Sequence, residues 1–226
     1  MSARGWFVTG TDTGVGKTLV ACALLHRLRV HGRRVAALKP VAAGCRQTPD
    51  GLRNDDAVRL RAAAGRDDTY ARVNPYAFAP PIAPHLAAAE AGVAIDLAVI
   101  ERGYRDLAGA VDDVVVEGAG GWLVPLDDRH TLADVARRLG LDVVLVVGVR
   151  LGCLNHALLT AASVRDHGLR LAGWVASVVD PRVERLDGQL QTLRARLAAP
   201  CWGVVPPLAD PSPAAVAAHL APEALA

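Results

Sequence analysis

Trp6-Phe-Val-Thr-Gly-Thr-Asp-Thr-Gly-Val-Gly-Lys-Thr18 is the stretch that decides the fold. Its apolar beginning predicts a buried strand, and the glycines that follow break that strand. An amphipathic helix comes next, because Val20, Leu24 and Leu28 recur four residues apart on one helical face. A strand, a glycine-rich turn and a helix in this order are the setting that a phosphate-binding P-loop requires. We therefore expect an anion site at the start of this helix.

The residues of this turn fit that role one by one. A helix start offers free N–H groups and a positive dipole end to an anion. Gly10, Gly14 and Gly16 permit backbone conformations that a side chain would block. Lys17 supplies a charge for the outer phosphates, and the Thr18 hydroxyl is placed for Mg²⁺. The first glycine is displaced from the usual spacing. A glycine-rich turn that only caps a βα unit is the alternative, and the Gly-Lys-Thr triplet argues against it.

The composition of the 226-residue chain indicates one α/β domain over residues 1–226, with a substantial core. Hydrophobic residues make up 52% of the chain but aromatic residues only 4%, so small aliphatic residues dominate. This balance fits parallel strands covered by helices of small residues. A formal net charge of +2 gives no basic field that would attract nucleic acid.

The four cysteines, Cys22, Cys45, Cys153 and Cys201, have none of the paired spacings of zinc or dithiol sites. We expect them to stay reduced, which favours an intracellular protein. No apolar run reaches the length of a membrane span, and the N-terminus enters a core strand at once. The sequence therefore predicts a cytoplasmic protein that binds neither a membrane nor nucleic acid.

Two further strands are expected to deliver polar side chains to one edge of the sheet. Residues 34–38 predict a buried strand that ends at Lys39, one of only two lysines in the chain. Residues 113–116 predict another, which ends at Glu117 before a glycine-rich turn. The carboxyl ends of strands in an open α/β sheet build its ligand sites. Glu117 is therefore placed to act on Mg²⁺ or its waters, unless it only terminates a strand.

The run Asn54-Asp55-Asp56 stands where another helix is predicted to begin. Acidic residues at a helix start interact favourably with its dipole, so capping explains one of these acids. Their position near the expected phosphate edge keeps metal binding open as the alternative.

The rest of the chain continues the alternation of strands and helices. The loop before Arg53 is polar, and the proline-rich residues 73–85 predict an irregular active-site or interface loop that packs through Tyr76 and Phe78. Helices are expected over 96–109, over 131–139 with Thr131 as N-cap, up to about 167, over 184–197 and after Ser212, and strands over 143–147, 171–179 and 202–205.

The helix that runs to about residue 167 also begins after a glycine-containing strand end, so a second anion can sit at its start. Asn155 and His156 stand at this start. They either orient a polar ligand or cap the helix, and the periodicity favours the cap.

Five motifs in this order resemble the dethiobiotin synthetase family, whose members catalyse the penultimate step of biotin synthesis. They are Gly10-Thr-Asp-Thr-Gly-Val-Gly-Lys-Thr18, Lys39-Pro-Val, Val116-Glu-Gly-Ala-Gly-Gly121, Gly152-Cys-Leu-Asn-His156 and Ala172-Gly-Trp-Val175. The likeness runs from about residue 5 to residue 208. It implies a doubly wound, mostly parallel P-loop NTPase fold of three αβα layers, and a homodimer with the active site at the subunit interface.

The resemblance also implies the reaction. ATP as co-substrate and Mg²⁺ would serve a ring closure of 7,8-diaminononanoate with CO₂. One amine becomes a carbamate, the carbamate attacks the γ-phosphate to give a carbamic–phosphoric anhydride, and the second amine closes the ureido ring. Such a site must neutralise phosphate charge and hold two reactants in line.

Carried over by motif, the resemblance assigns roles to particular residues. Lys17 and Lys39 would be catalytic, with Lys17 on the outer phosphates and Lys39 on the carbamate and the transferring phosphoryl group. Thr18, Asp56 and Glu117 would hold Mg²⁺. The nucleotide would contact Gly14, Val15, Gly16, Lys17, Thr18, Leu19, Asp56, Glu117, Gly118, Ala119, Gly120, Ser177, Val178, Pro206, Pro207 and Leu208. The substrate would contact Thr13, Lys39 and Ala43, and Gly152, Cys153, Leu154 and Asn155 of the neighbouring subunit.

Three residues depart from the family pattern. Gly14 stands where many relatives place Glu, and Ala43 where a Ser often touches the substrate. Ser177 replaces an Asn that reads the base, so the preference for ATP over CTP or GTP stays open. None of these departures touches the phosphate or metal chemistry.

Two other classes of P-loop protein are alternatives. An amidoligase of the cobyrinic acid diamide synthase type usually carries a glutaminase domain, for which this chain has no residues left. A partitioning ATPase of the MinD or ParA type carries an extra lysine early in the P-loop, where this chain has Thr11-Asp-Thr13.

Overall fold

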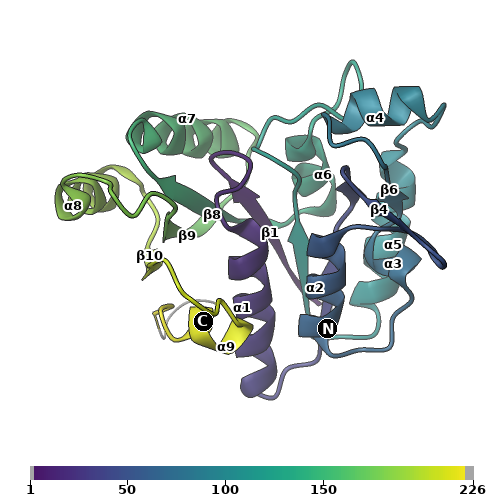
Figure 1. Cartoon of the computed structure of the whole chain (residues 1–226), viewed down its shortest axis with the longest axis horizontal. Helices are drawn as coiled ribbons and strands as arrows, with labels where there is room; N and C mark the ends of the chain where they lie inside the picture. Colours follow the sequence, from purple (N-terminus) through teal and green to yellow (C-terminus); the bar gives the residue numbers. More distant parts are fainter. Residues whose placement is uncertain (1–2, 222–226) are drawn as a thin grey trace.

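A six-stranded parallel sheet runs through the centre of the computed structural model, which describes residues 3–221 (Figure 1). Its strand order is β10-β9-β8-β1-β7-β2. The strands are β1 (Arg4–Gly10), β2 (Val35–Leu38), β7 (Asp113–Glu117), β8 (Asp142–Val149), β9 (Leu171–Val178) and β10 (Cys201–Val205). The chain leaves the central strand β1 toward one side and later returns to build the other, so β1 lies at the switch point where such sheets bind ligands. The predicted doubly wound α/β fold is confirmed.

Helices cover both faces of this sheet (Figure 1). The helices α1 (Lys17–Val30), α2 (Asp55–Ala64) and α9 (Pro213–Ala217) pack on one face, and α5 (Leu97–Ala108), α6 (Leu132–Leu139), α7 (Cys153–Asp166) and α8 (Leu186–Arg196) on the other. Alternate side chains of β1 serve the two cores, because Trp6 and Val8 face α1 whereas Phe7 faces α5 and α6. The predicted buried face of α1 is confirmed, since Val20, Leu24 and Leu28 are all buried.

Several short elements were not predicted. The polar loop before Arg53 contains β3 (Val41–Ala42) and a hairpin of β4 (Arg46–Thr48) and β5 (Gly51–Arg53). The proline-rich residues 73–85 begin at the last residue of α3 (Tyr70–Val73). They contain β6 (Tyr76–Ala77) and the start of α4 (Pro84–Glu90). These segments are too short to show a hydrophobic period, so the expected loops were wrong in detail. The expected packing is confirmed, because Phe78 is buried and Tyr76 packs against the same core.

The helix caps test the sequence patterns more finely. Thr131 forms a capping box with Asp134, and Ser212 accepts a hydrogen bond from the Ala215 N–H at 3.2 Å, so both expected caps are confirmed. The cap expected from Asn155 and His156 is wrong. The N-cap of α7 is Gly152 in the left-handed region at φ 92°, and no side chain caps this helix. Within residues 3–221, no helix has the length and apolarity needed to cross a bilayer.

Candidate active site

The turn between β1 and α1 is held by close contacts that only glycine permits at two positions. Gly16 lies in the left-handed region at φ 90°, and a Cβ there would stand 2.9 Å from the Ser177 Oγ. A Cβ at Gly10 would stand 2.6 Å from a methyl group of Val15. The displaced first glycine of the motif is therefore required by packing, and Gly16 by both packing and φ.

Lys17 opens α1 with its side chain curled back over this turn. Its Nζ donates a hydrogen bond to the carbonyl oxygen of Asp12 at 3.0 Å, and only 7% of the residue is exposed. Burial, together with the like charge of Lys39, lowers the pKa of Lys17 to about 8. An anion bound in the turn would favour the charged form of this amine. The charged amine could then bind the anion, as a P-loop lysine does.

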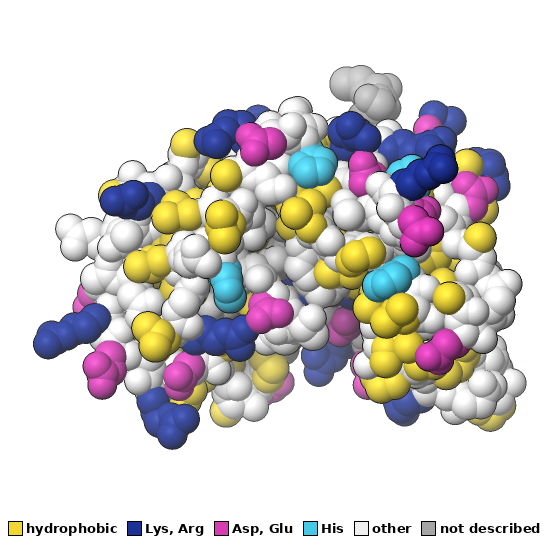
Figure 2. All heavy atoms as spheres, turned by 90° about the horizontal axis from the view of Figure 1, so that it is seen from above, with side chains coloured by type: hydrophobic (Ala, Val, Ile, Leu, Met, Phe, Trp, Pro, Cys, Tyr) yellow, Lys and Arg dark blue, Asp and Glu magenta, His cyan; other side chains and the backbone are white. Residues whose placement is uncertain are grey.

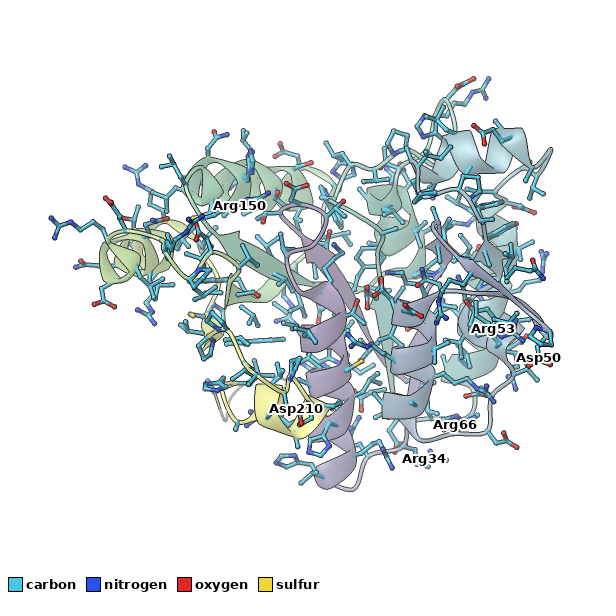
Figure 3. All side chains as sticks on the ribbon, in the orientation of Figure 1. Arg34, Asp50, Arg53, Arg66, Arg150 and Asp210 are labelled. Carbon is cyan, nitrogen blue, oxygen red and sulfur yellow. The ribbon has the colours of Figure 1, made fainter. Side chains whose placement is uncertain are left out.

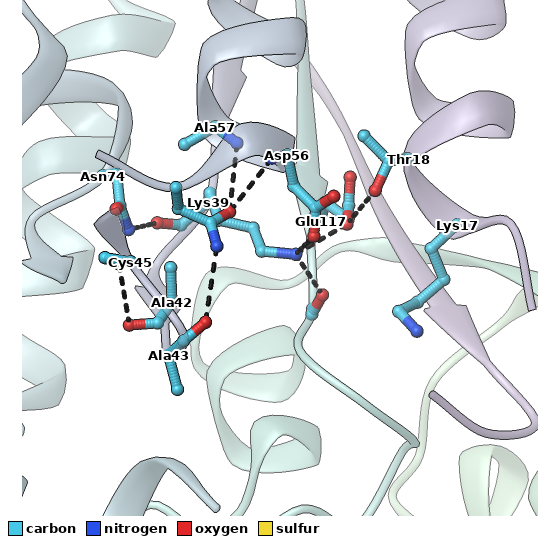
Figure 4. Close-up of polar contacts among 12 residues, drawn as sticks. Lys17, Thr18, Lys39, Ala42, Ala43, Cys45, Asp56, Ala57, Asn74 and Glu117 are labelled. Atoms are coloured by element: carbon cyan, nitrogen blue, oxygen red, sulfur yellow. Dashed lines mark hydrogen bonds and ion pairs between the residues drawn. The ribbon is translucent and has the colours of Figure 1, made fainter. Parts of the chain in front are cut away.

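Lys39 leaves the end of β2 and lies between two carboxylates (Figure 4). Its Nζ donates to Glu117 Oε1 at 2.6 Å, to Asp56 Oδ2 at 3.1 Å and to the Gly118 carbonyl at 3.1 Å. Lys39 is 3% exposed and Glu117 is fully buried. Burial alone would lower the pKa of Lys39, but Glu117 and Asp56 outweigh it and hold this pKa above its usual value. The second lysine of the chain is thus a buried cation beside the P-loop.

Glu117 is the common partner at this edge of the sheet (Figure 4). Its Oε1 also accepts a hydrogen bond from the Thr18 hydroxyl at 2.9 Å. Its Oε2 is buried and has no hydrogen-bond partner among residues 3–221. A buried carboxylate oxygen without a partner is costly, unless a cation or its waters satisfy it.

Asp56, and not Asp55, turns toward this cluster. Asn54 caps α2, because its side chain accepts from the N–H groups of Asp56 and Ala57. Asp55 instead pairs with Arg46 at the surface. Asp56 is free to reach Lys39, whose charge outweighs burial and lowers the pKa of Asp56. Hydroxyl and carboxylate oxygens are the ligands that Mg²⁺ prefers, so the residues present fit this ion.

A cavity of about 730 Å³ lies over the P-loop and the strand ends. Figure 2 shows the corresponding face of the molecule, hollowed in its middle between two raised parts. Its volume is within the usual range of small-molecule sites. The expected site residues that line it are Thr13, Gly14, Gly16, Lys17, Thr18, Leu19, Lys39, Ala43, Asp56, Ala119 and Gly120. The sequence missed Ala42, Asn54, Arg59, Pro81, Ile82, Ala83, Pro84 and Val124 as individual contacts, although the proline-rich region was expected to form an active-site or interface loop.

The other expected contact residues lie outside the lining of this cavity. Val15 is buried, with a methyl group 2.5 Å from where a Cβ of Gly148 would stand. Ser177 and Val178 end β9, and Pro206, Pro207 and Leu208 follow β10. The residues from Gly152 to Asn155 begin α7, after Leu151, which is 96% exposed.

Arg150 lies in the segment between β8 and α7 and was not expected to take part in the site (Figure 3). Its guanidinium pairs with the carboxylate of Asp12, the residue whose carbonyl holds Lys17. The same carboxylate accepts a hydrogen bond from the Thr13 N–H at 2.7 Å. Arg150 thus holds the P-loop through Asp12. These two residues are far apart in sequence, so no local pattern could predict their ion pair.

Known proteins of similar sequence indicate which family has a site of this kind. A family model described as an AAA domain matches residues 4–215. The chain is 58% identical to the ATP-dependent dethiobiotin synthetase BioD of Pseudomonas paraeruginosa, and the match covers 95% of each chain. It is 52% identical to the protein of the same name from Aromatoleum aromaticum, over 96% of each chain, and 50% identical to that of Xanthomonas oryzae, over 97% of this chain and 98% of the relative.

Among solved structures, the signal recognition particle receptor FtsY from Elizabethkingia anophelis in complex with GDP is similar in fold, with a TM-score of 0.51 and 16% sequence identity. The match covers 90% of this chain and 57% of that receptor. At this identity the likeness concerns the arrangement of strands and helices alone, and it agrees with a P-loop NTPase fold.

Proposed function

We propose a reaction path from one premise: the chain belongs to the ATP-dependent dethiobiotin synthetase family, with relatives 50–58% identical over 95–97% of its length. It is an ATP-dependent ligase of biotin biosynthesis. One observation carries the proposed path, namely that buried Lys39 lies at the mouth of a P-loop with Glu117 and Asp56. A phosphoryl acceptor at Lys39 would stand next to the outer phosphates held at Lys17.

The path has three steps. An amine of 7,8-diaminononanoate adds to CO₂ and loses a proton, which gives a carbamate. A carbamate oxygen attacks the γ-phosphorus and the bond to the β-phosphate oxygen breaks, which gives ADP and a carbamic–phosphoric anhydride. The second amine attacks the carbonyl carbon and expels phosphate, which closes the ureido ring. The protein contributes mainly by positioning the reactants and by neutralising charge.

Two lysines divide the charge between these steps. Lys17 binds the β- and γ-phosphates, because its amine lies in the P-loop turn where an anion restores its charged form. Lys39 binds the carbamate and then the transferring phosphoryl group. Its ion pairs with Glu117 and Asp56 keep it protonated, so it acts as a fixed positive charge.

Thr18, Asp56 and Glu117 would hold Mg²⁺. The unpartnered Glu117 Oε2 supports this assignment, since a buried carboxylate oxygen needs a cation or ordered water. The ion would neutralise charge on the β- and γ-phosphates during transfer.

We expect Asp56→Ala to raise the Mg²⁺ concentration at half-maximal turnover about tenfold or more, because one ligand oxygen is lost. Titrating Mg²⁺ at saturating ATP and diamine measures this. Asp55→Ala is the matched control, since the Asp55 carboxylate is next in sequence but pairs with Arg46 at the surface. An unchanged Mg²⁺ dependence in Asp56→Ala would exclude Asp56 as a metal ligand and leave it only its ion pair with Lys39.

The substrate would lie between two subunits of a homodimer. Thr13 and Ala43 line the cavity, and the start of α7 in the neighbouring subunit would receive the substrate carboxylate from Gly152 to Asn155. The free N–H groups of a helix start suit a carboxylate. The fully exposed Leu151 beside this helix start supports an interface there, because a large apolar side chain gains from burial.

The shared site predicts activity from mixtures of two inactive proteins. Asn155→Glu places a repelling charge at the third residue of α7, where an acid favours the helix itself. Lys39→Ala and Asn155→Glu homodimers should each be nearly inactive. Co-expression makes about half of the dimers mixed, with one sound site in two, so turnover should recover to roughly a quarter of wild type. Isolated mixed dimers that stay inactive would place the whole site within one chain.

The adenine would lie against Ser177, Val178 and Pro206 to Leu208, and Ser177 leaves the preference among ATP, CTP and GTP open. We also propose that residues 1–226 form one domain in the cytoplasm, without nucleic acid or membrane as partners. The six-stranded sheet, against which all the larger helices of residues 3–221 pack, supports the first point, and the four free cysteines support a reducing compartment.

The whole proposal is tested by measuring phosphate release with ATP alone, with 7,8-diaminononanoate, and with diamine plus CO₂. We expect release only when all three are present, and a product whose mass equals that of the diamine plus CO₂ minus one water. Turnover that needs DNA or lipid vesicles instead would contradict the proposed reaction.

A further inference from the structure

A second cavity, of about 460 Å³, lies beside the first on the outer side of α1. Its floor is one face of this helix, with Leu19, Cys22 and His26, and its walls are α2 and the segment 210–213 before α9. Asp210 marks that far wall (Figure 3). None of the residues from Cys22 onward has a role in the reaction path above. The cavity therefore needs an explanation of its own.

Three residues line both cavities, namely Thr18, Leu19 and Arg59. Thr18 and Leu19 form the first turn of α1, directly after the P-loop lysine. Arg59 projects from α2, three residues after Asp56 and thus on the same side of that helix. The junction of the two cavities is therefore flanked by the P-loop helix on one side and by an arginine on the other.

Arg59 differs from its neighbours in having its charge available. Within residues 3–221 its guanidinium makes no hydrogen bond or ion pair. Arg61, on the same helix, is held by the carbonyl oxygen of Asp68 at 2.6 Å. The charge of Arg59 acts on Cys22 of α1. Burial raises the pKa of the Cys22 thiol, to about 12 overall, and the positive charge of Arg59 opposes this rise. A positive charge at the junction thus faces the first two turns of α1.

We propose that Arg59 binds the α- and β-phosphates of ATP at this junction, where the nucleoside passes the mouth of the second cavity toward the adenine residues Pro206 to Leu208. This proposal rests on the nucleotide binding described above. The triphosphate is anchored at Lys17 and Thr18, so its inner phosphates leave the first cavity past Leu19. A guanidinium can bind two phosphate oxygens at once. The far wall of the second cavity also begins two residues after Leu208, the last of the residues against which the adenine is proposed to lie.

Arg59→Ala should weaken the binding of both ADP and ATP about ten- to a hundredfold, as the loss of a hydrogen bond to a charged group does. Adenosine should bind equally to both proteins, because it has no phosphate. Arg59→Lys should lie between, since it keeps the charge and loses the two-point geometry. Calorimetric titrations with ADP, ATP and adenosine, each with EDTA and with Mg²⁺, measure these dissociation constants.

Arg194→Ala is the matched control, because it removes an exposed arginine from α8, which lines neither cavity. ADP binding within twofold of wild type in a folded Arg59→Ala protein would overturn the proposal, as would an equal loss in the Arg194 variant. A parallel loss of adenosine binding would also overturn it, since Arg59 would then shape the nucleoside pocket. These titrations contain no diamine, so they stand even if the product assay contradicts the proposed reaction.

Discussion

Lys17→Ala is expected to abolish measurable turnover and to weaken ATP binding at least a hundredfold. Lys17 is 7% exposed, and its amine is held over the P-loop turn by one backbone carbonyl. Replacing it removes the point charge that would bind the outer phosphates. Lys17→Met is the matched variant, because it fills the same volume without the charge. ATP binding close to wild type in the Met variant would exclude Lys17 as a phosphate ligand.

The low pKa of Lys17 adds a pH dependence to this prediction. In the nucleotide-free protein the amine is protonated below about pH 8 and loses its proton above it. Phosphate binds the protonated form, so ATP affinity should be steady below pH 8 and fall up to about tenfold per pH unit above it. Lys17→Met should show no such fall. A flat affinity between pH 7 and pH 9.5 in the wild-type protein would contradict the assignment.

The sequence predicted the sheet well where residues repeat with a clear period or end at a clear signal. The strand from Asp113 to Glu117 has the expected bounds, and α5 begins directly after Asp96, at the expected start. A parallel strand buried on both faces reads as a continuous apolar run, and a glycine-rich turn after it marks its end. For the same reason, the order of residues alone is enough to place Lys39 and Glu117 at one edge of the sheet.

The contacts within that edge could not be predicted in the same way. Lys39 and Glu117 are 78 residues apart, and no spacing along the chain reports that their side chains meet. Asp55 and Asp56 looked alike in sequence. The cap made by Asn54 decides that Asp56 faces inward, and a cap depends on the local backbone as well as on residue type.

The errors have a similar cause. Asn155 and His156 were expected to cap the start of α7, yet Gly152 takes the left-handed conformation there and α7 starts without a side-chain cap. The wall of the cavity from Pro81 to Pro84 follows Pro80, whose carbonyl oxygen accepts a hydrogen bond from the distant Gly44 N–H at 3.0 Å. In both places tertiary structure overrides local preference.

Lys39→Ala is expected to lower turnover about a hundredfold or more at saturating substrates while ATP binding stays within a few-fold of wild type. A fixed charge that acts on the transferring phosphoryl group contributes more to the transition state than to the bound nucleotide. ATP affinity and turnover should be measured in both lysine variants. We expect Lys17→Ala to lower both quantities, and Lys39→Ala to lower turnover alone. Near-normal turnover in this variant would remove Lys39 from the catalytic residues.

The same substitution should also destabilise the fold, and this effect must be separated from catalysis. It leaves the fully buried carboxylate of Glu117 without its cation, and breaking a buried pair on one side costs about 3–5 kcal/mol. For a chain of this size that corresponds to a fall in Tm of several degrees, on the order of 2–4 °C per kcal/mol. Turnover is therefore measured well below the Tm of each variant. Lys39→Met, which keeps most of the side-chain volume, should lose turnover as fully as Lys39→Ala because the missing charge is the same. If Lys39→Met instead retained turnover, the loss in the alanine variant would come from the cavity and the unfolding that it promotes.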